Sequence, residues 1–144
     1  TMTEGLVGLC DAYYELSRRD RKARLAGPRS SAEGGAEVDR SLDRPLRASI
    51  AELAKLSRLL PIAGPCADNR VALRQLRAGS RWRAARTFRR ALAGATRFEL
   101  PYERALAHAG LAACTGAADH TNDARAGFTF LGASWRLTTP SFGI

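Results

Sequence analysis

The chain has 144 residues, of which 45% are hydrophobic and 26% are charged, the composition of one ordinary globular domain with its own core. No apolar run reaches the roughly 18 to 20 residues of a membrane span, and residues 1–8 lack the basic start of a signal peptide, so we expect a cytoplasmic protein with no membrane partner. The formal net charge of +9 favours either an acidic partner such as nucleic acid or simply a solvated basic surface.

Cysteine usage points to a reducing compartment. The three cysteines, Cys10, Cys66 and Cys114, are odd in number and widely spaced. This pattern argues against a disulfide framework. We therefore expect reduced thiols that behave as small buried hydrophobes.

The first 40 residues contain two segments of different character. Residues 5–26 carry apolar side chains at three- and four-residue steps, among them Leu6, Leu9 and Tyr13, and predict a helix within an N-terminal segment 1–26. Residues 27–40, "GPRSSAEGGAEVDR", are small, polar and glycine-rich. With no apolar face to bury, they predict a flexible loop.

Residues 41–136 read as one helical domain. Ser41 is expected to open a helix with Pro45 in its first turn, and Pro61 to end it. One stripe of this helix should be buried: Leu46, Ile50, Leu53, Leu56, Leu59 and Leu60. Further helices are expected at residues 66–78, 81–98 and 102–114 and from 123 on, followed by a tail at 137–144.

The segment 81–98 is the most clearly amphipathic part of the chain. At 100° per residue, one face carries small and aromatic residues, namely Ala84, Phe88, Ala91, Ala95 and Phe98. The opposite face carries arginines, namely Arg83, Arg86, Arg90 and Arg97, with Arg89 at its edge. This pattern predicts a helix with one buried and one basic face.

A shift of forty residues aligns the chain with itself. Pro61 then falls on Pro101 and Phe88 on Phe128, and Ala84 falls on Ala124 in the same frame. A period of this size with two helices in each unit is typical of stacked helical hairpins, which bury their apolar faces only against neighbours. The sequence therefore predicts an all-α solenoid of about five to six helices.

Three strings carry a resemblance to a known family. They are "GSRWRAARTFRRALAGATRFELPYERALAHAGLA" at residues 79–112, "LLPIAGPCA" at 59–67 and "FTFLGASW" at 128–135. They resemble a degenerate tetratricopeptide-type repeat, and in particular the C-terminal helical region of bacterial signal-transduction ATPases linked to adenylate or guanylate cyclases, protein kinases or LuxR-type regulators. The resemblance implies a right-handed solenoid of antiparallel hairpins that acts as a sensor or scaffold. The helix at 66–78 lacks the family's Trp, Leu-Gly and Tyr, and no P-loop sequence is present.

Motifs for chemistry are missing from the sequence. It contains no Gly-x-Ser-x-Gly elbow and no Cys-x-x-Cys or His-x-x-x-His pair. Convergence of Cys66, His108, Cys114 and His120 on a metal is possible in principle but unsupported by spacing. We therefore expect no enzyme activity, no cofactor and no metal.

The function predicted from the sequence is protein–protein recognition. Stacked hairpins form an extended surface for a peptide or for another domain of the same polypeptide. The residues expected to line it belong to the first helix of each hairpin: Arg70, Arg74, Arg77, Tyr102, Glu103 and His108. The alternative is nucleic-acid binding through arginines of the segment 81–98: Arg83, Arg86, Arg89, Arg90 and Arg97. The sequence leaves the oligomeric state open.

Overall fold

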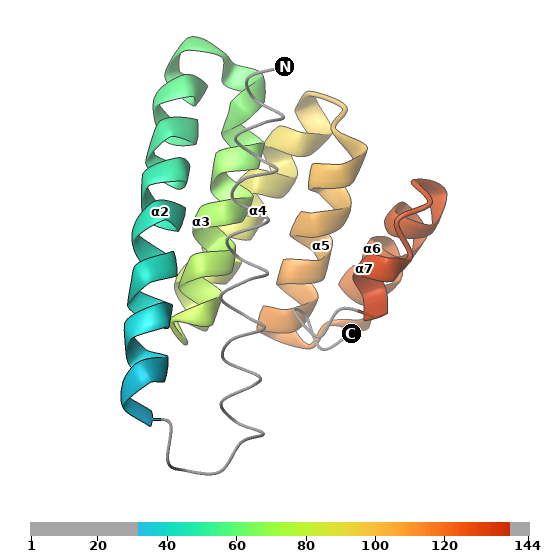
Figure 1. Ribbon diagram of the computed structural model, residues 1–144. Coiled ribbons are helices and arrows are strands. Elements are labelled where there is room, and N and C mark those ends of the chain that lie inside the picture. Colours follow the sequence, from blue (N-terminus) through green and yellow to red (C-terminus); the bar gives the residue numbers. More distant parts are fainter. Residues whose placement is uncertain (1–31, 139–144) are drawn as a thin grey trace. The chain divides into compact units, whose positions relative to one another are not determined.

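The computed structural model describes residues 32–138, with side chains for 44–136, and every regular element in this range is a helix (Figure 1). The chain divides into two units between Leu56 and Ser57. The helix predicted at 5–26 and most of the tail at 137–144 lie outside the described residues. The elements are α2 (Ala32–Leu59), the 3₁₀ helix η2 (Pro61–Ala63), α3 (Gly64–Arg77), α4 (Arg81–Arg97), α5 (Pro101–Thr115), α6 (Ala118–Phe130) and the short α7 (Trp135–Thr138).

Helix α2 is longer than the sequence pattern predicts. It begins at Ala32, so the predicted loop at 27–40 is wrong from residue 32 onward, and Pro45 lies inside the helix rather than in its first turn. The Gly34–Gly35 pair costs roughly 1 kcal/mol per residue in a helix, which weakens this stretch without ending it. The buried stripe is also shorter than expected, because Leu46, Ile50 and Leu53 are buried whereas Leu59 is 80% exposed.

In the second unit each helix packs against the next one in the chain, and α3 also contacts α5 (Figure 1). Two antiparallel hairpins result, α3/α4 and α5/α6. Their core combines a few large side chains with many alanines. The fully buried large side chains include Phe88, Phe128, Leu106 and Leu111. The prediction of an all-helical chain is confirmed for the described residues.

The two hairpins repeat, but in a different register from the one that the sequence suggests. The first helices correspond at forty positions: Pro61 and Pro101 each open the first helical turn of their hairpin. The second helices correspond at 33 positions, because Gly94 packs on Pro65 of α3 as Gly127 packs on Ala105 of α5. The second hairpin is shorter, and α4 with 17 residues exceeds α6 with 13.

The helix ends confirm this register. At the end of α4 the Leu100 amide donates to the Ala95 carbonyl, and at the end of α6 the Ala133 amide donates to the Phe128 carbonyl. Both ends pass through a residue with positive φ, Glu99 (φ 53°) in one hairpin and Gly132 (φ 65°) in the other. All these positions differ by 33.

The aligned phenylalanines of the forty-residue frame are therefore not equivalent. Phe88 lies directly over Gly110 of α5, in the next hairpin. Phe128 instead meets Tyr102 within its own hairpin, edge to face, with ring centroids 6.0 Å apart. The predicted pairing of Phe88 with Phe128 is wrong, because seven residues are missing between the two helices of the second hairpin.

Replacing Gly110 with Ala should destabilise the protein by about 1–3 kcal/mol, because a Cβ at this position would overlap the fully buried ring of Phe88. Gly64→Ala is the matched control: Gly64 is also helical, and a Cβ there meets nothing within 4 Å. The control should stabilise by roughly 0.5–1 kcal/mol. Urea unfolding measures both changes, and equal effects of the two substitutions would contradict the packing of Phe88 on Gly110.

Candidate functional site

A pocket of about 350 Å³ lies between α3 and α4. Asp68 of α3 and Arg90 of α4 form an ion pair across it: Arg90 Nε donates to Asp68 Oδ2 at 2.7 Å, and Nη2 donates to Oδ1. This two-point contact raises the pKa of Arg90, mainly through the hydrogen bond to Asp68. The pocket is lined by Pro61, Gly64, Pro65, Asp68, Arg90, Ala93, Gly94, Arg97 and Phe98.

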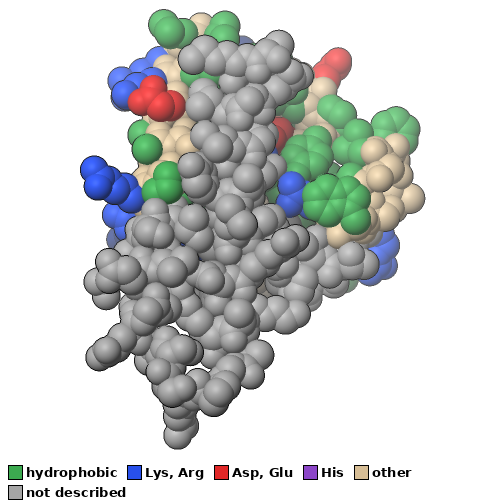
Figure 2. Space-filling model, viewed as in Figure 1, with side chains coloured by type: hydrophobic (Ala, Val, Ile, Leu, Met, Phe, Trp, Pro, Cys, Tyr) green, Lys and Arg blue, Asp and Glu red, His purple; other side chains and the backbone are tan. Residues whose placement is uncertain are grey.

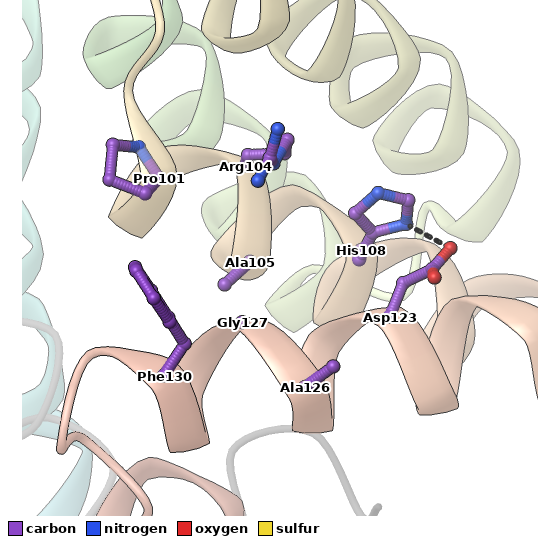
Figure 3. Close-up of a pocket in the computed structure, with 8 residues that line it drawn as sticks. All are labelled: Pro101, Arg104, Ala105, His108, Asp123, Ala126, Gly127 and Phe130. Carbon is purple, nitrogen blue, oxygen red and sulfur yellow. Dashed lines mark ion pairs between the residues drawn. The ribbon is translucent and has the colours of Figure 1, made fainter.

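A second pocket, of about 400 Å³, lies between α5 and α6 (Figure 3). His108 of α5 faces Asp123 of α6 at one end, with 3.5 Å between His108 Nδ1 and Asp123 Oδ2. At the other end Pro101 and the 86% exposed Phe130 form an apolar margin. The pocket is lined by Pro101, Arg104, Ala105, His108, Asp123, Ala126, Gly127 and Phe130.

The two pockets occupy equivalent places in the two hairpins. On the first helices, the lining residues correspond at forty positions: Pro61 and Pro101, Gly64 and Arg104, Pro65 and Ala105, Asp68 and His108. On the second helices they correspond at 33 positions: Arg90 and Asp123, Ala93 and Ala126, Gly94 and Gly127, Arg97 and Phe130. The ionisable pair across each pocket is thus retained while its chemistry changes from Asp–Arg to His–Asp.

Two of the residues predicted to bind a partner are instead part of the core. Arg70 is 2% exposed and Glu103 is 5% exposed. Arg70 Nη1 donates to Glu103 Oε1 at 2.6 Å and to Oε2 at 2.5 Å, and the amide of Asn69 donates to Oε2 at 2.7 Å. These contacts join α3 to α5, and they correct the prediction that Arg70 and Glu103 line a binding surface.

The remaining predicted partner residues are only partly accessible. Arg74 and Arg77 are half-buried on α3 and line neither pocket. Tyr102 is half-buried against Phe128. His108 alone among the predicted residues lines one of the two pockets.

The arginines of α4 remain on the surface. Arg83, Arg86 and Arg89 are exposed, as the amphipathic pattern predicts. Arg90 is held by Asp68, and the Arg97 guanidinium lies 5.5 Å from the ring centre of Phe98. Two of the five predicted anion-binding arginines therefore belong to the α3/α4 pocket.

The two histidines meet between α5 and α6, although the sequence pattern placed His120 in a turn. Helix α6 begins at Ala118, so His120 lies in its first turn, on the same face as Asp123 three residues later. The Nδ1 atoms of His108 and His120 are 3.0 Å apart. Burial lowers the pKa of His108; His120 and Arg104 lower it further, whereas Asp123 opposes the shift.

The described cysteines are poor nucleophiles. Burial raises the pKa of the Cys66 thiol to about 12, and the nearby Glu103 carboxylate adds to the effect. Burial also raises the pKa of Cys114. Because the thiolate is the reactive form, neither residue suggests covalent chemistry.

Exposed aromatic side chains collect near the C-terminal helices. Phe130 and Trp135, which is 58% exposed, lie on α6 and α7. Figure 2 shows hydrophobic side chains gathered on the side where Figure 1 places these helices. In the part of the chain that the structure describes, no helix has both the length and the hydropathy to cross a membrane.

No family model, no curated protein and no solved structure matches this chain. The resemblance to tetratricopeptide-type signalling proteins consequently stays a prediction from its sequence strings.

Replacing Glu103 with Gln should lower the free energy of unfolding by about 3 kcal/mol or more, because it takes the carboxylate away from a buried guanidinium. Glu99→Gln is the control: Glu99 is exposed, and its replacement should stay within about 0.5 kcal/mol of the wild type. Chemical denaturation followed by circular dichroism measures both. A loss below about 1 kcal/mol for Glu103→Gln would contradict the buried pair.

Stability should fall as the pH drops below about 6.5, the pKa of an unperturbed histidine. The pKa of His108 is lower in the folded protein, so the unfolded chain takes up this proton first and acid favours unfolding. Urea unfolding at about pH 7.5 and about pH 5.5 measures the loss, and His108→Gln should reduce the difference between the two values. The same pH dependence in both proteins would contradict the role of His108.

Proposed function

We propose that the chain is a non-catalytic protein–protein interaction module whose helical hairpins bind an extended segment of a partner protein. The observation that carries this proposal is the recurrence of one pocket at equivalent positions of successive hairpins. Pockets that recur along stacked hairpins suit an extended chain, because successive side chains of the ligand can enter successive pockets.

The pockets have the chemistry of a peptide site. Each has an apolar floor made by a proline or alanine on the first helix and a glycine on the second, as at Pro65 and Gly94. Each also has an ionisable pair at its rim, Asp68 with Arg90 or His108 with Asp123. Apolar floors supply affinity, and a few polar groups at fixed places supply specificity.

The architecture we propose for the module is a right-handed, tetratricopeptide-like solenoid. It is supported by the two equivalent hairpins and by the strings at residues 79–112 and 128–135. Following the same resemblance, we propose a cytoplasmic role as a sensor or scaffold in bacterial signal transduction. The partner is then a protein segment or another domain of the same polypeptide.

Nucleic-acid binding is the second candidate, and the exposure of Arg83, Arg86 and Arg89 on one helix favours it. Arginines that neutralise phosphates release counterions, so binding would weaken steeply with salt. Fluorescence anisotropy with labelled duplex DNA and RNA at low salt tests this candidate. No change in anisotropy would remove it.

Filling the pockets should abolish peptide binding. Ala93 and Ala126 are exposed and occupy equivalent lining positions, so Ala93→Arg and Ala126→Arg place the same side chain in each pocket. Peptides selected from a random library against the wild type should lose at least about tenfold in affinity for one or both variants, which corresponds to about 1.4 kcal/mol.

Ala117→Arg is the matched control, because Ala117 is exposed in the turn before α6 and lines neither pocket. It should leave peptide affinity unchanged. Failure to select any peptide, or selection of peptides indifferent to both pocket substitutions, would contradict the proposal.

A further inference from the structure

We propose that His108, His120 and Asp123 form a binding site for a divalent transition-metal ion that bridges α5 and α6. The three side chains offer two imidazole nitrogens and one carboxylate oxygen, and the three ligand atoms lie within 4.8 Å of one another. This site is independent of peptide binding, and it reverses our expectation from the sequence that no metal is bound.

The distances suit a tetrahedral ion. Bonds of roughly 2.0–2.1 Å to zinc place neighbouring ligand atoms about 3.4 Å apart. The observed separations are 3.0 Å between the two Nδ1 atoms and 3.5 Å between His108 Nδ1 and Asp123 Oδ2. Small rotations of these side chains would bring all three ligand atoms to bonding distance of one ion.

Both imidazoles turn the same nitrogen toward a common point. Without a metal, one Nδ1 donates a shared proton to the other across the 3.0 Å separation. A metal ion can replace this proton when both rings carry their remaining proton on Nε2. The lowered pKa of His108 helps, because a metal ligand must be neutral.

The donor set selects the class of ion. Imidazole with carboxylate favours zinc, copper, nickel or cobalt over magnesium and calcium, which prefer all-oxygen sites. Asp123 is 59% exposed, so an ion can reach the cluster from solvent. His108 and Asp123 also line the α5/α6 pocket, so a coordination position not taken by the protein is available to water or a small ligand (Figure 3).

Arg104 is the one unfavourable neighbour among the charged groups that influence His108. It lies one turn before His108 on α5 and lowers its pKa, as a positive charge nearby does. The same repulsion should weaken metal binding, so replacing Arg104 with Ala should tighten it. This effect gives the proposal a test in the direction of gained affinity.

The first experiment adds Zn²⁺ to the reduced full chain at about pH 7.5 and records the imidazole nitrogens by NMR. The chain has two histidines, so both rings can be assigned without ambiguity. We expect one equivalent of Zn²⁺ to shift both Nδ1 resonances. Unchanged Nδ1 resonances, or shifts of one ring alone, would overturn the site.

Calorimetry on variants then locates the carboxylate ligand. Asp123→Asn should weaken Zn²⁺ binding by at least about tenfold, since loss of even an outer-shell partner costs roughly 10–100-fold. Asp119→Asn is the matched control, because Asp119 is an exposed carboxylate in the same first turn of α6 but outside the cluster. It should leave the affinity unchanged, whereas equal effects of the two substitutions would overturn the role of Asp123.

The double variant His108→Gln/His120→Gln separates this site from binding to thiols. We expect it to lose Zn²⁺ binding while keeping its helical circular dichroism. Retained binding would assign the ion to cysteines and overturn the proposal. If the double variant does not fold, His120→Gln alone decides, since His120 is only half-buried: binding as tight as the wild type's would be the overturning result.

Discussion

The contact on which the second unit depends is the buried pair of Arg70 and Glu103. A guanidinium or carboxylate this deeply buried is costly on its own, so neither side chain is stable in the core without an opposite charge. The pair, strengthened by the Asn69 amide, requires α3 and α5 to lie side by side. Because each of these helices opens a hairpin, one polar contact determines how the two hairpins are aligned.

Around this contact the core is built mainly from small residues. Alanines and glycines let helices approach closely, and the few large rings occupy specific places, such as Phe88 over Gly110. A close contact between a glycine on one helix and a proline or alanine on the other lies in the floor of each pocket, with an ionisable pair at the rim. The recurrence of these pockets follows from the repetition of this packing, with a shorter second hairpin.

The sequence predicted what depends on local pattern and missed what depends on contacts between distant residues. The helices α3, α4 and α5 lie within two residues of their expected bounds, because apolar periodicity and the prolines define them. The register of the repeat failed, because aligned letters such as Phe88 and Phe128 carry no information on which helix they face. The burial of Arg70 was missed since a lone arginine is expected at the surface, and its partner lies 33 residues away. The signal for the histidine cluster was present only as His120 and Asp123 at a spacing of three residues.

A double-mutant cycle on Arg70 and Glu103 tests the central claim most directly. Arg70→Met and Glu103→Leu are each expected to destabilise by about 3 kcal/mol or more, because each leaves one buried charge, whereas the double variant buries none. The account predicts that the double variant is more stable than the sum of the single losses allows, with a coupling of at least about 2 kcal/mol. Single losses that add to within about 0.5 kcal/mol would mean that the two side chains do not interact in the folded protein, and the alignment of the hairpins would need another cause.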